Sequence, residues 1–273
     1  MKLVLDSNYL QNDETRSFLS ESDSNFVVLT EYAAIEAYKG NDYRTIYKSM
    51  SLISRFPNQV IIPKNTINIC GMNLLENELP DILINKEETK LFPEFSARLI
   101  ESTKDSSLYK ESLEEHQEAA NLQMSRIRSD APKLIEGFKG VEKTYTPNDI
   151  KELRKGNISE SFFDKLVENS LTTTALLMRD HPSVDEAPEL NLLPNNFLFR
   201  NAVCFQVLLM KWVSKGSPNQ FKIEKTVNDI IDMNFVVFAL YFDGIMSNDK
   251  KLIEVYEDAK LLLDIFKASF QET

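Results

Sequence analysis

The chain has 273 residues, of which 42% are hydrophobic and 27% are charged, so it can bury a sizeable core and is not disordered throughout. Its 31 basic and 42 acidic residues give a net charge of −11, which opposes non-specific binding to nucleic acid and suits a basic partner. Two cysteines exclude a disulfide framework, and no leader segment or apolar run of about 18 residues is found, so we expect a cytoplasmic protein without a membrane span.

Short apolar runs and helical patterns alternate in the first part of the chain. Residues 2–5 and 26–29 are apolar runs between polar residues, which is typical of buried parallel strands, and residues 59–62 are a third strand candidate. The segments between and after these runs have helical patterns, one of them ended by Gly40. The predicted helices are residues 13–21, 31–39 and 43–54.

From about residue 72 to residue 220 the pattern is almost entirely helical. The strand and helix alternation returns near residue 221, and together these changes predict an α/β fold interrupted by a large all-helical insertion. The expected domains are a catalytic domain of residues 1–71 plus 221–273 and an insertion of residues 72–220. The predicted elements are helices at 91–102, 107–128, 158–178, 196–214, 225–241 and 250–268, and a strand at 244–247.

Carboxylates recur beside the ends of these predicted elements. Asp6 follows the first strand, and Glu36 lies among small apolar residues on the helix after the second strand. Asp229 and Asp232 share one face at the start of an apolar helix, and Asp249 follows the last strand. Like charges that are gathered in space are costly unless a cation neutralises them or some stay protonated. A divalent-metal site is the simplest reason to bring such residues together.

Each carboxylate also has a structural interpretation. Asp6 and Asp249 have the sequence context of turn residues or helix caps. Glu36 could be an ordinary solvated residue, and Glu31 suits the helix dipole, as the pair Asp229 and Asp232 also would. The metal hypothesis therefore depends on all of them together rather than on one residue.

The motifs that carry these carboxylates resemble those of the PIN-domain nucleases. The run Leu5-Asp6-Ser7-Asn8-Tyr9-Leu10 approximates the first motif of that family, and Thr30 to Glu36 has the spacing of the second. Asp232 is followed by Ala239-Leu240 as in the third motif, and Gly244 to Asp249 matches the last. The chain departs from the family pattern by serine in place of threonine at two positions, by Tyr9 and by a slightly short spacing from Asp232 to Asp249.

The resemblance covers the two ends of the chain, about 124 residues, and not the helical middle. It implies a twisted parallel sheet flanked by helices, one or two Mg²⁺ or Mn²⁺ ions and endonucleolytic cleavage of RNA. In that reading Asp6 is the central metal ligand, and Glu36, Asp232 and Asp249 complete the shell directly or through water. Asp229 is an extra or alternative ligand. The residues that would orient the metal shell from outside it are Asn8 and Ser247.

Other functions remain open at this stage. A structure-specific DNA nuclease or a non-catalytic adaptor that binds a basic protein would have the same motifs. An aspartate-nucleophile phosphatase usually requires a second aspartate where Asn8 stands. Both histidines, His116 and His181, suit structural roles. A regulatory partner of the antitoxin kind and a homo-oligomer are possible partners beside RNA.

The predicted insertion contains a basic stretch, residues 126–155, with eight basic and five acidic residues. Phe138 and Tyr145 lie within it and could stack on unpaired bases. The insertion could serve as a lid over substrate, a dimer surface or a module that binds a regulator. The apolar segment 196–214 indicates a core helix rather than a membrane contact.

Overall fold

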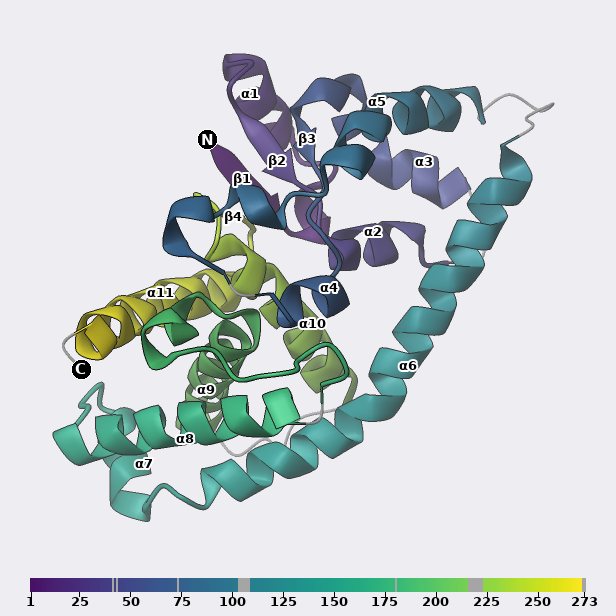
Figure 1. Ribbon diagram of the computed structural model, residues 1–273. Helices are drawn as coiled ribbons and strands as arrows, with labels where there is room; N and C mark the ends of the chain where they lie inside the picture. Colours follow the sequence, from purple (N-terminus) through teal and green to yellow (C-terminus); the bar gives the residue numbers. More distant parts are fainter. Residues whose placement is uncertain are drawn as a thin grey trace. The chain divides into compact units, whose positions relative to one another are not determined.

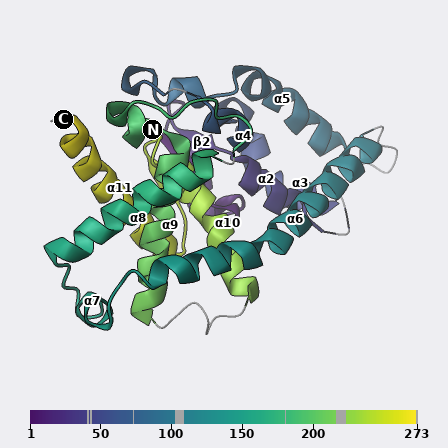
Figure 2. The ribbon, with the colours of Figure 1, turned by 60° about the horizontal axis from the view of Figure 1, so that its bottom comes forward.

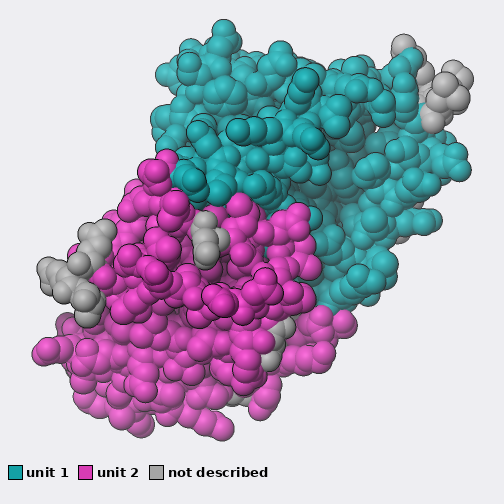
Figure 3. All heavy atoms as spheres, in the orientation of Figure 1, with its two compact units in different colours: residues 1–66, 78–127, 238–253 teal, residues 67–77, 128–237, 254–273 magenta. Residues whose placement is uncertain are grey.

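The computed structural model in Figure 1 is an α/β fold in which helices predominate. Contacts between backbone positions divide the chain into two compact units, which Figure 3 shows in different colours. Unit 1 comprises residues 1–66, 78–127 and 238–253, and unit 2 comprises residues 67–77, 128–237 and 254–273. The structure describes residues 1–40, 42, 44–72, 74–102, 109–179, 181–215 and 223–271.

A parallel β-sheet forms the centre of unit 1. Its strand order is β3-β2-β1-β4, and Val4 of β1 pairs with Val28 of β2 and with Ile245 of β4. The central strands are apolar and largely inaccessible to solvent, as expected for a sheet covered on both faces. Because the strands are parallel, their carboxyl ends meet at one edge, where Asp6 and Ser247 follow β1 and β4. The strands are β1 (Lys2–Leu5), β2 (Phe26–Val28), β3 (Val60–Ile61) and β4 (Gly244–Met246).

The helices of unit 1 connect the strands and position the residues at that edge. Asn12 caps the first of them, which leads from β1 to β2, and Thr30 caps the second, which follows β2. The second helix packs against the third and against the 3-10 turn after β1, and these helices lie side by side in Figure 2. These α-helices are α1 (Asp13–Glu21), α2 (Glu31–Tyr38), α3 (Arg44–Met50) and α5 (Lys86–Glu101). The 3-10 turns of this unit are η1 (Ser7–Tyr9), η2 (Ile53–Arg55), η3 (Pro57–Gln59) and η5 (Asp81–Leu83).

Helix α9 (Phe197–Lys215) is the core of unit 2 and is buried on nearly every side, as the sequence predicts. It packs against α8, α7 and η6, and Phe199 meets Phe266 edge to face with ring centroids 5.0 Å apart. Among the described residues, no helix is long and apolar enough to cross a membrane. The other elements of this unit are α7 (Pro147–Leu153), α8 (Glu160–Arg179) and η6 (Leu190–Asn195).

Some helices have residues in both units. They are α4 (Thr66–Cys70), η4 (Glu76–Glu78), α6 (Lys110–Glu142), α10 (Ile223–Ala239) and α11 (Lys250–Gln271).

The predicted strands and longer helices are confirmed to within a few residues at most of their ends. The main differences are that α6 continues to Glu142 and that α4 and α7 were not predicted. Helices of five and seven residues are too short for hydrophobic periodicity to reveal them. The expected division into residues 1–71 plus 221–273 and an insertion of 72–220 stays a prediction, and its boundary between 220 and 221 lies outside the described residues.

A close backbone approach in unit 2 requires glycine at position 71. A Cβ atom added to Gly71 would lie 1.8 Å from the backbone oxygen of Ser183, so the backbone would have to move to admit alanine. We expect Gly71→Ala to lower the free energy of unfolding by about 1–3 kcal/mol, the usual cost of overpacking. Gly137 is the matched control, because nothing lies within 4 Å of its added Cβ. Gly137→Ala should raise the free energy of unfolding by about 0.5–1 kcal/mol, since it lies inside α6. Urea unfolding of both variants measures this, and equal effects would contradict the close approach.

Candidate active site

Asp6 lies at the carboxyl edge of the sheet, directly after β1. Its backbone N–H donates to the Met246 oxygen of the neighbouring strand at 3.1 Å, and its side chain is only 2% exposed. The Ser247 hydroxyl donates to Asp6 Oδ2 at 2.7 Å, and the backbone N–H of Asn8 lies 3.4 Å from Oδ1. The Asn8 amide adds a long contact of 3.5 Å to Oδ2. A buried carboxylate requires such donors, because burying an unpaired charge is costly.

Glu36 is brought to the same place by α2. The Thr30 hydroxyl accepts from the Ala33 N–H at 3.3 Å and fixes the start of this helix, which packs against η1. The Ser7 hydroxyl donates to Glu36 Oε2 and also lies 3.3 Å from Asp6 Oδ1. A hydroxyl has one hydrogen, so it satisfies one carboxylate at a time. Asp6 and Glu36 therefore share a single neutral donor.

Glu36 forms an ion pair with Lys39. The Lys39 ammonium lies 2.9 Å from Glu36 Oε1, one helical turn along the chain, and the Glu36 side chain is 17% exposed. The spacing of three residues on a helix is a signal for such a pair that the sequence contains.

Ser247 and Asp249 form the turn after β4. The Ser247 hydroxyl, which donates to Asp6, also accepts from the Asp249 N–H at 3.0 Å. Asp249 Oδ1 accepts from the N–H groups of Lys251 at 2.8 Å and Leu252 at 3.2 Å, so Asp249 caps α11. Asp249 thus has the helix-capping role that its sequence context allows. The Ser247 hydroxyl connects its backbone N–H to the Asp6 carboxylate.

Asp229 and Asp232 belong to α10 in unit 2. Asp229 is buried, and its Oδ2 accepts from the Trp212 indole N–H at 2.8 Å. This contact joins two helices of the same unit and was not indicated by the sequence. Asp232 is partly exposed. The assignment of Asp229 and Asp232 to the metal site stays a prediction.

The structure therefore brings Asp6, Glu36 and Asp249 to one edge of the sheet, with the predicted outer residues Asn8 and Ser247 beside Asp6. Three further residues have contacts at this edge that the sequence analysis did not predict: Ser7, Lys39 and Tyr9. Tyr9 had a signal, because it departs from the PIN-domain pattern where a smaller residue is common. Comparisons with family models, with curated proteins and with solved structures find no match for this chain.

The carboxylate oxygens at this edge are of the kind that Mg²⁺ and Mn²⁺ prefer as ligands. Within the described ranges, no three or more His, Cys, Asp or Glu side chains are arranged so that they could hold a metal ion. Mg²⁺ is commonly held by one or two carboxylates with water and substrate phosphate as the other ligands. Asp6 and Glu36, which share Ser7, fit that smaller set of ligands.

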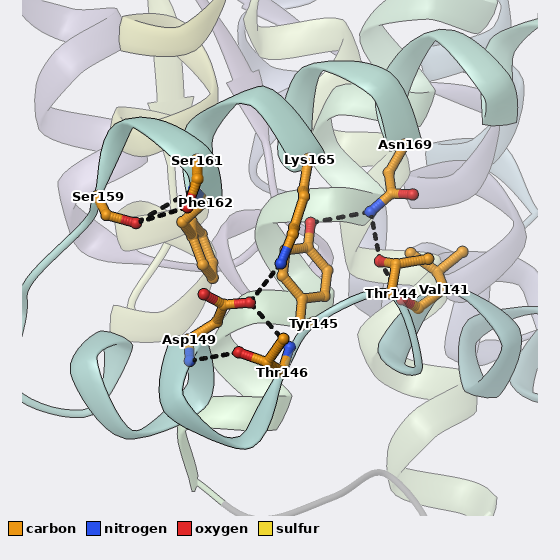
Figure 4. Close-up of polar contacts among 10 residues, drawn as sticks. All are labelled: Val141, Thr144, Tyr145, Thr146, Asp149, Ser159, Ser161, Phe162, Lys165 and Asn169. Carbon is orange, nitrogen blue, oxygen red and sulfur yellow. Dashed lines mark hydrogen bonds and ion pairs between the residues drawn. The ribbon is translucent and has the colours of Figure 1, made fainter.

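The predicted base-stacking role of Tyr145 is wrong, because this side chain is buried at 4% exposure. Figure 4 shows how it is held: the Asn169 amide donates to its hydroxyl at 3.1 Å, and its ring packs on Phe162 with centroids 4.9 Å apart. Tyr145 is therefore a core residue that packs against α8. The side chains of Phe138 and Lys139 lie outside the described part of the chain.

An ion pair that titrates joins α7 and α8. Lys165 Nζ lies 2.6 Å from Asp149 Oδ2, and Asp149 also caps α7 together with Thr146 (Figure 4). The hydrogen bond from Lys165, followed by that from the Thr146 backbone, lowers the pKa of Asp149 below its ordinary value of 3.8. A carboxyl group with a lowered pKa stabilises the fold above its ordinary pKa, and this contribution is lost as the pH falls through the lowered value.

We expect Lys165→Met to lower the free energy of unfolding at pH 7 by up to about 1 kcal/mol, as for other partly exposed ion pairs. The difference from the unchanged protein should shrink as the pH falls below about 4, the ordinary pKa of the carboxyl group, and disappear below the lowered pKa of Asp149. Lys133→Met is the matched control, because Lys133 pairs with Asp130 at 3.0 Å on a far more exposed surface. Thermal unfolding at pH 7, 5 and 3 checks this, and a difference that does not change with pH would contradict it.

Proposed function

We propose that this chain is a metal-dependent endoribonuclease that hydrolyses phosphodiester bonds at the carboxyl edge of its sheet. The observation that supports this best is the position of Ser7, whose hydroxyl contacts the carboxylates of both Asp6 and Glu36. Asp6 directly follows β1 and Glu36 lies on α2, the helix after β2, so both are at the carboxyl edge of the sheet, where open α/β sheets bind ligands. Two carboxylates held this close repel each other unless a cation is bound or a proton is shared.

Asp6 and Glu36 would hold a Mg²⁺ or Mn²⁺ ion, and water and the substrate phosphate would be its other ligands. Asp249 would act on the ion through water. Such an ion lowers the pKa of a bound water and neutralises charge on the phosphate. Ser247 and Asn8 orient Asp6 for this role through the contacts described above.

Lys39 has a separate role in this proposal. Its ammonium compensates the charge of Glu36 and is 43% exposed, so it can move away when Glu36 takes another partner. A released ammonium beside the site can then pair with a phosphate oxygen of the substrate.

Each of the two predicted domains has a role in the proposed function. Residues 1–71 plus 221–273 form a PIN-like catalytic domain in the cytoplasm, and residues 72–220 form an insertion that selects substrate or binds a regulator. RNA is the expected polymer, as the resemblance to PIN-domain nucleases implies. A regulatory protein and a second copy of the chain are further proposed partners.

A non-catalytic adaptor is the second candidate, and specific contacts favour it. Glu36 pairs with Lys39, and Asp249 Oδ1 accepts two backbone N–H groups of α11. Both carboxylates thus have structural partners without a metal. A DNA nuclease is a variant of the first candidate that differs only in the polymer it cleaves.

The test is cleavage of labelled single-stranded RNA and DNA with Mn²⁺, Mg²⁺ or EDTA. We expect cleavage of RNA that requires metal, and a loss of at least about 100-fold in Asp6→Asn and Glu36→Gln, because each removes charge stabilisation at the reacting phosphate. Glu31→Gln is the matched control on the same helix. Glu31 accepts from the Thr66 N–H at 2.9 Å, and glutamine keeps an acceptor there, so its rate should stay within about twofold of the unchanged protein.

Each other result has a definite meaning. Cleavage of DNA alone would identify the DNA nuclease. No cleavage of either polymer, without a rise in melting temperature on addition of Mn²⁺, would contradict the nuclease and favour the adaptor. Equal losses in Glu31→Gln and Glu36→Gln would show that Glu36 is not a specific ligand.

A further inference from the structure

The hydroxyl of Tyr9 connects three segments around the candidate site. Its oxygen lies 2.7 Å from Glu14 Oε2 on α1 and 2.9 Å from Asn248 Oδ1 in the turn after β4. Tyr9 itself ends η1, the turn that begins directly after Asp6. Asn248 stands between Ser247 and Asp249, so the contact reaches the turn that carries the last predicted ligand.

The Tyr9 side chain is fixed in place. The residue is 4% exposed, and its backbone oxygen accepts from the Thr15 hydroxyl at 2.7 Å and from the Asn12 N–H at 3.1 Å. A phenol hydroxyl has one hydrogen, which it donates to the Glu14 carboxylate or to Asn248. If Glu14 takes the hydrogen, the Asn248 amide can present its NH₂ group to the Tyr9 oxygen by a half rotation, so both contacts can be satisfied together.

Tyr9 remains a neutral donor at every pH at which nucleases are usually assayed. Burial is the main cause, followed by the hydrogen bond to Glu14, the charge of Glu14 and the charge of Asp6, and together they raise the pKa of Tyr9 to about 12. The hydrogen bonds to Glu14 and Asn248 place the hydroxyl between α1 and the turn after β4.

One contact alone does not define the position of the turn after β4. The Ser247 hydroxyl holds the start of the turn to Asp6 at 2.7 Å, and Asp249 at its end caps α11. Between them, Asn248 contacts the Tyr9 hydroxyl at 2.9 Å, which joins the middle of the turn to the segment after β1. Each residue of the turn that presents Asp249 thus has a hydrogen bond to another part of the fold.

We propose that Tyr9 is a positioning residue, whose hydroxyl holds the Ser247–Asp249 turn against the end of β1 and thereby fixes Asp249 relative to Asp6. Its effect on the reaction depends on the proposed nuclease function, whereas its effect on the turn does not. The residue acts through Asn248 and does not itself contact substrate in this proposal.

Tyr9→Phe removes the hydroxyl and keeps the buried ring. In the RNA cleavage assay with Mn²⁺ we expect kcat to fall about tenfold or more, because a small displacement of a catalytic group is costly, while KM stays within about twofold. Tyr47→Phe is the matched control: it removes a tyrosine hydroxyl from α3 of the same unit, outside the candidate site, and should leave kcat and KM unchanged. An unchanged kcat in Tyr9→Phe, with only a lower melting temperature, would overturn the positioning role.

A second measurement does not require activity. The Asp249 N–H donates to Ser247 Oγ at 3.0 Å, and its hydrogen exchange followed by NMR reports how firmly the turn is held. In Tyr9→Phe we expect this amide to exchange about tenfold faster, while the amide of Val28 in β2 exchanges at its former rate. Unchanged exchange at Asp249 would overturn the proposal. Faster exchange in a protein that cleaves no RNA would reject the nuclease function and retain the positioning role.

Discussion

The concentration of negative charge at one edge of a parallel sheet is the constraint on which this site depends. Parallel strands place Asp6 and the turn before Asp249 side by side, and the helix after β2 adds Glu36. The interior near a sheet has a low dielectric constant, so these carboxylates need donors or cations. Ser7 and Ser247 are neutral donors that reduce the repulsion without removing the charge. The proposed metal site depends on this remaining negative charge.

The groups that compensate the carboxylate charges differ between unit 2 and the sheet edge. In unit 2, Asp149 has Lys165 and the start of α7 as partners, and Asp229 accepts a hydrogen bond from the indole of Trp212. At the sheet edge, Asp6 accepts from hydroxyl and amide donors, and Glu36 shares one of them, the Ser7 hydroxyl. Asp149 and Asp229 thus have partners that stabilise the fold, and the proposed active site is the sheet edge.

The sequence predicted the strands, most of the longer helices and the edge where Asp6 lies, because these follow from local patterns. Apolar runs at residues 2–5 and 26–29 identify buried strands, and parallel pairing then determines which residues follow them at the same edge. Contacts between distant residues could not be predicted. Trp212 lies 17 residues from Asp229 on another helix, and Tyr145 is buried by packing against Phe162. Tertiary packing decides such partners, and no periodicity in the chain encodes it.

The central claim is that Asp6 and Glu36 bind a divalent cation, and titration of Mn²⁺ followed by electron paramagnetic resonance tests it most directly. The signal of free Mn²⁺ should fall as the unchanged protein binds the ion, and Glu36→Gln and Asp6→Asn should each weaken binding about tenfold or more, since each removes one charged oxygen ligand. Glu31→Gln should bind like the unchanged protein. No loss of free Mn²⁺ signal, or an equal loss in all four proteins, would contradict the metal site.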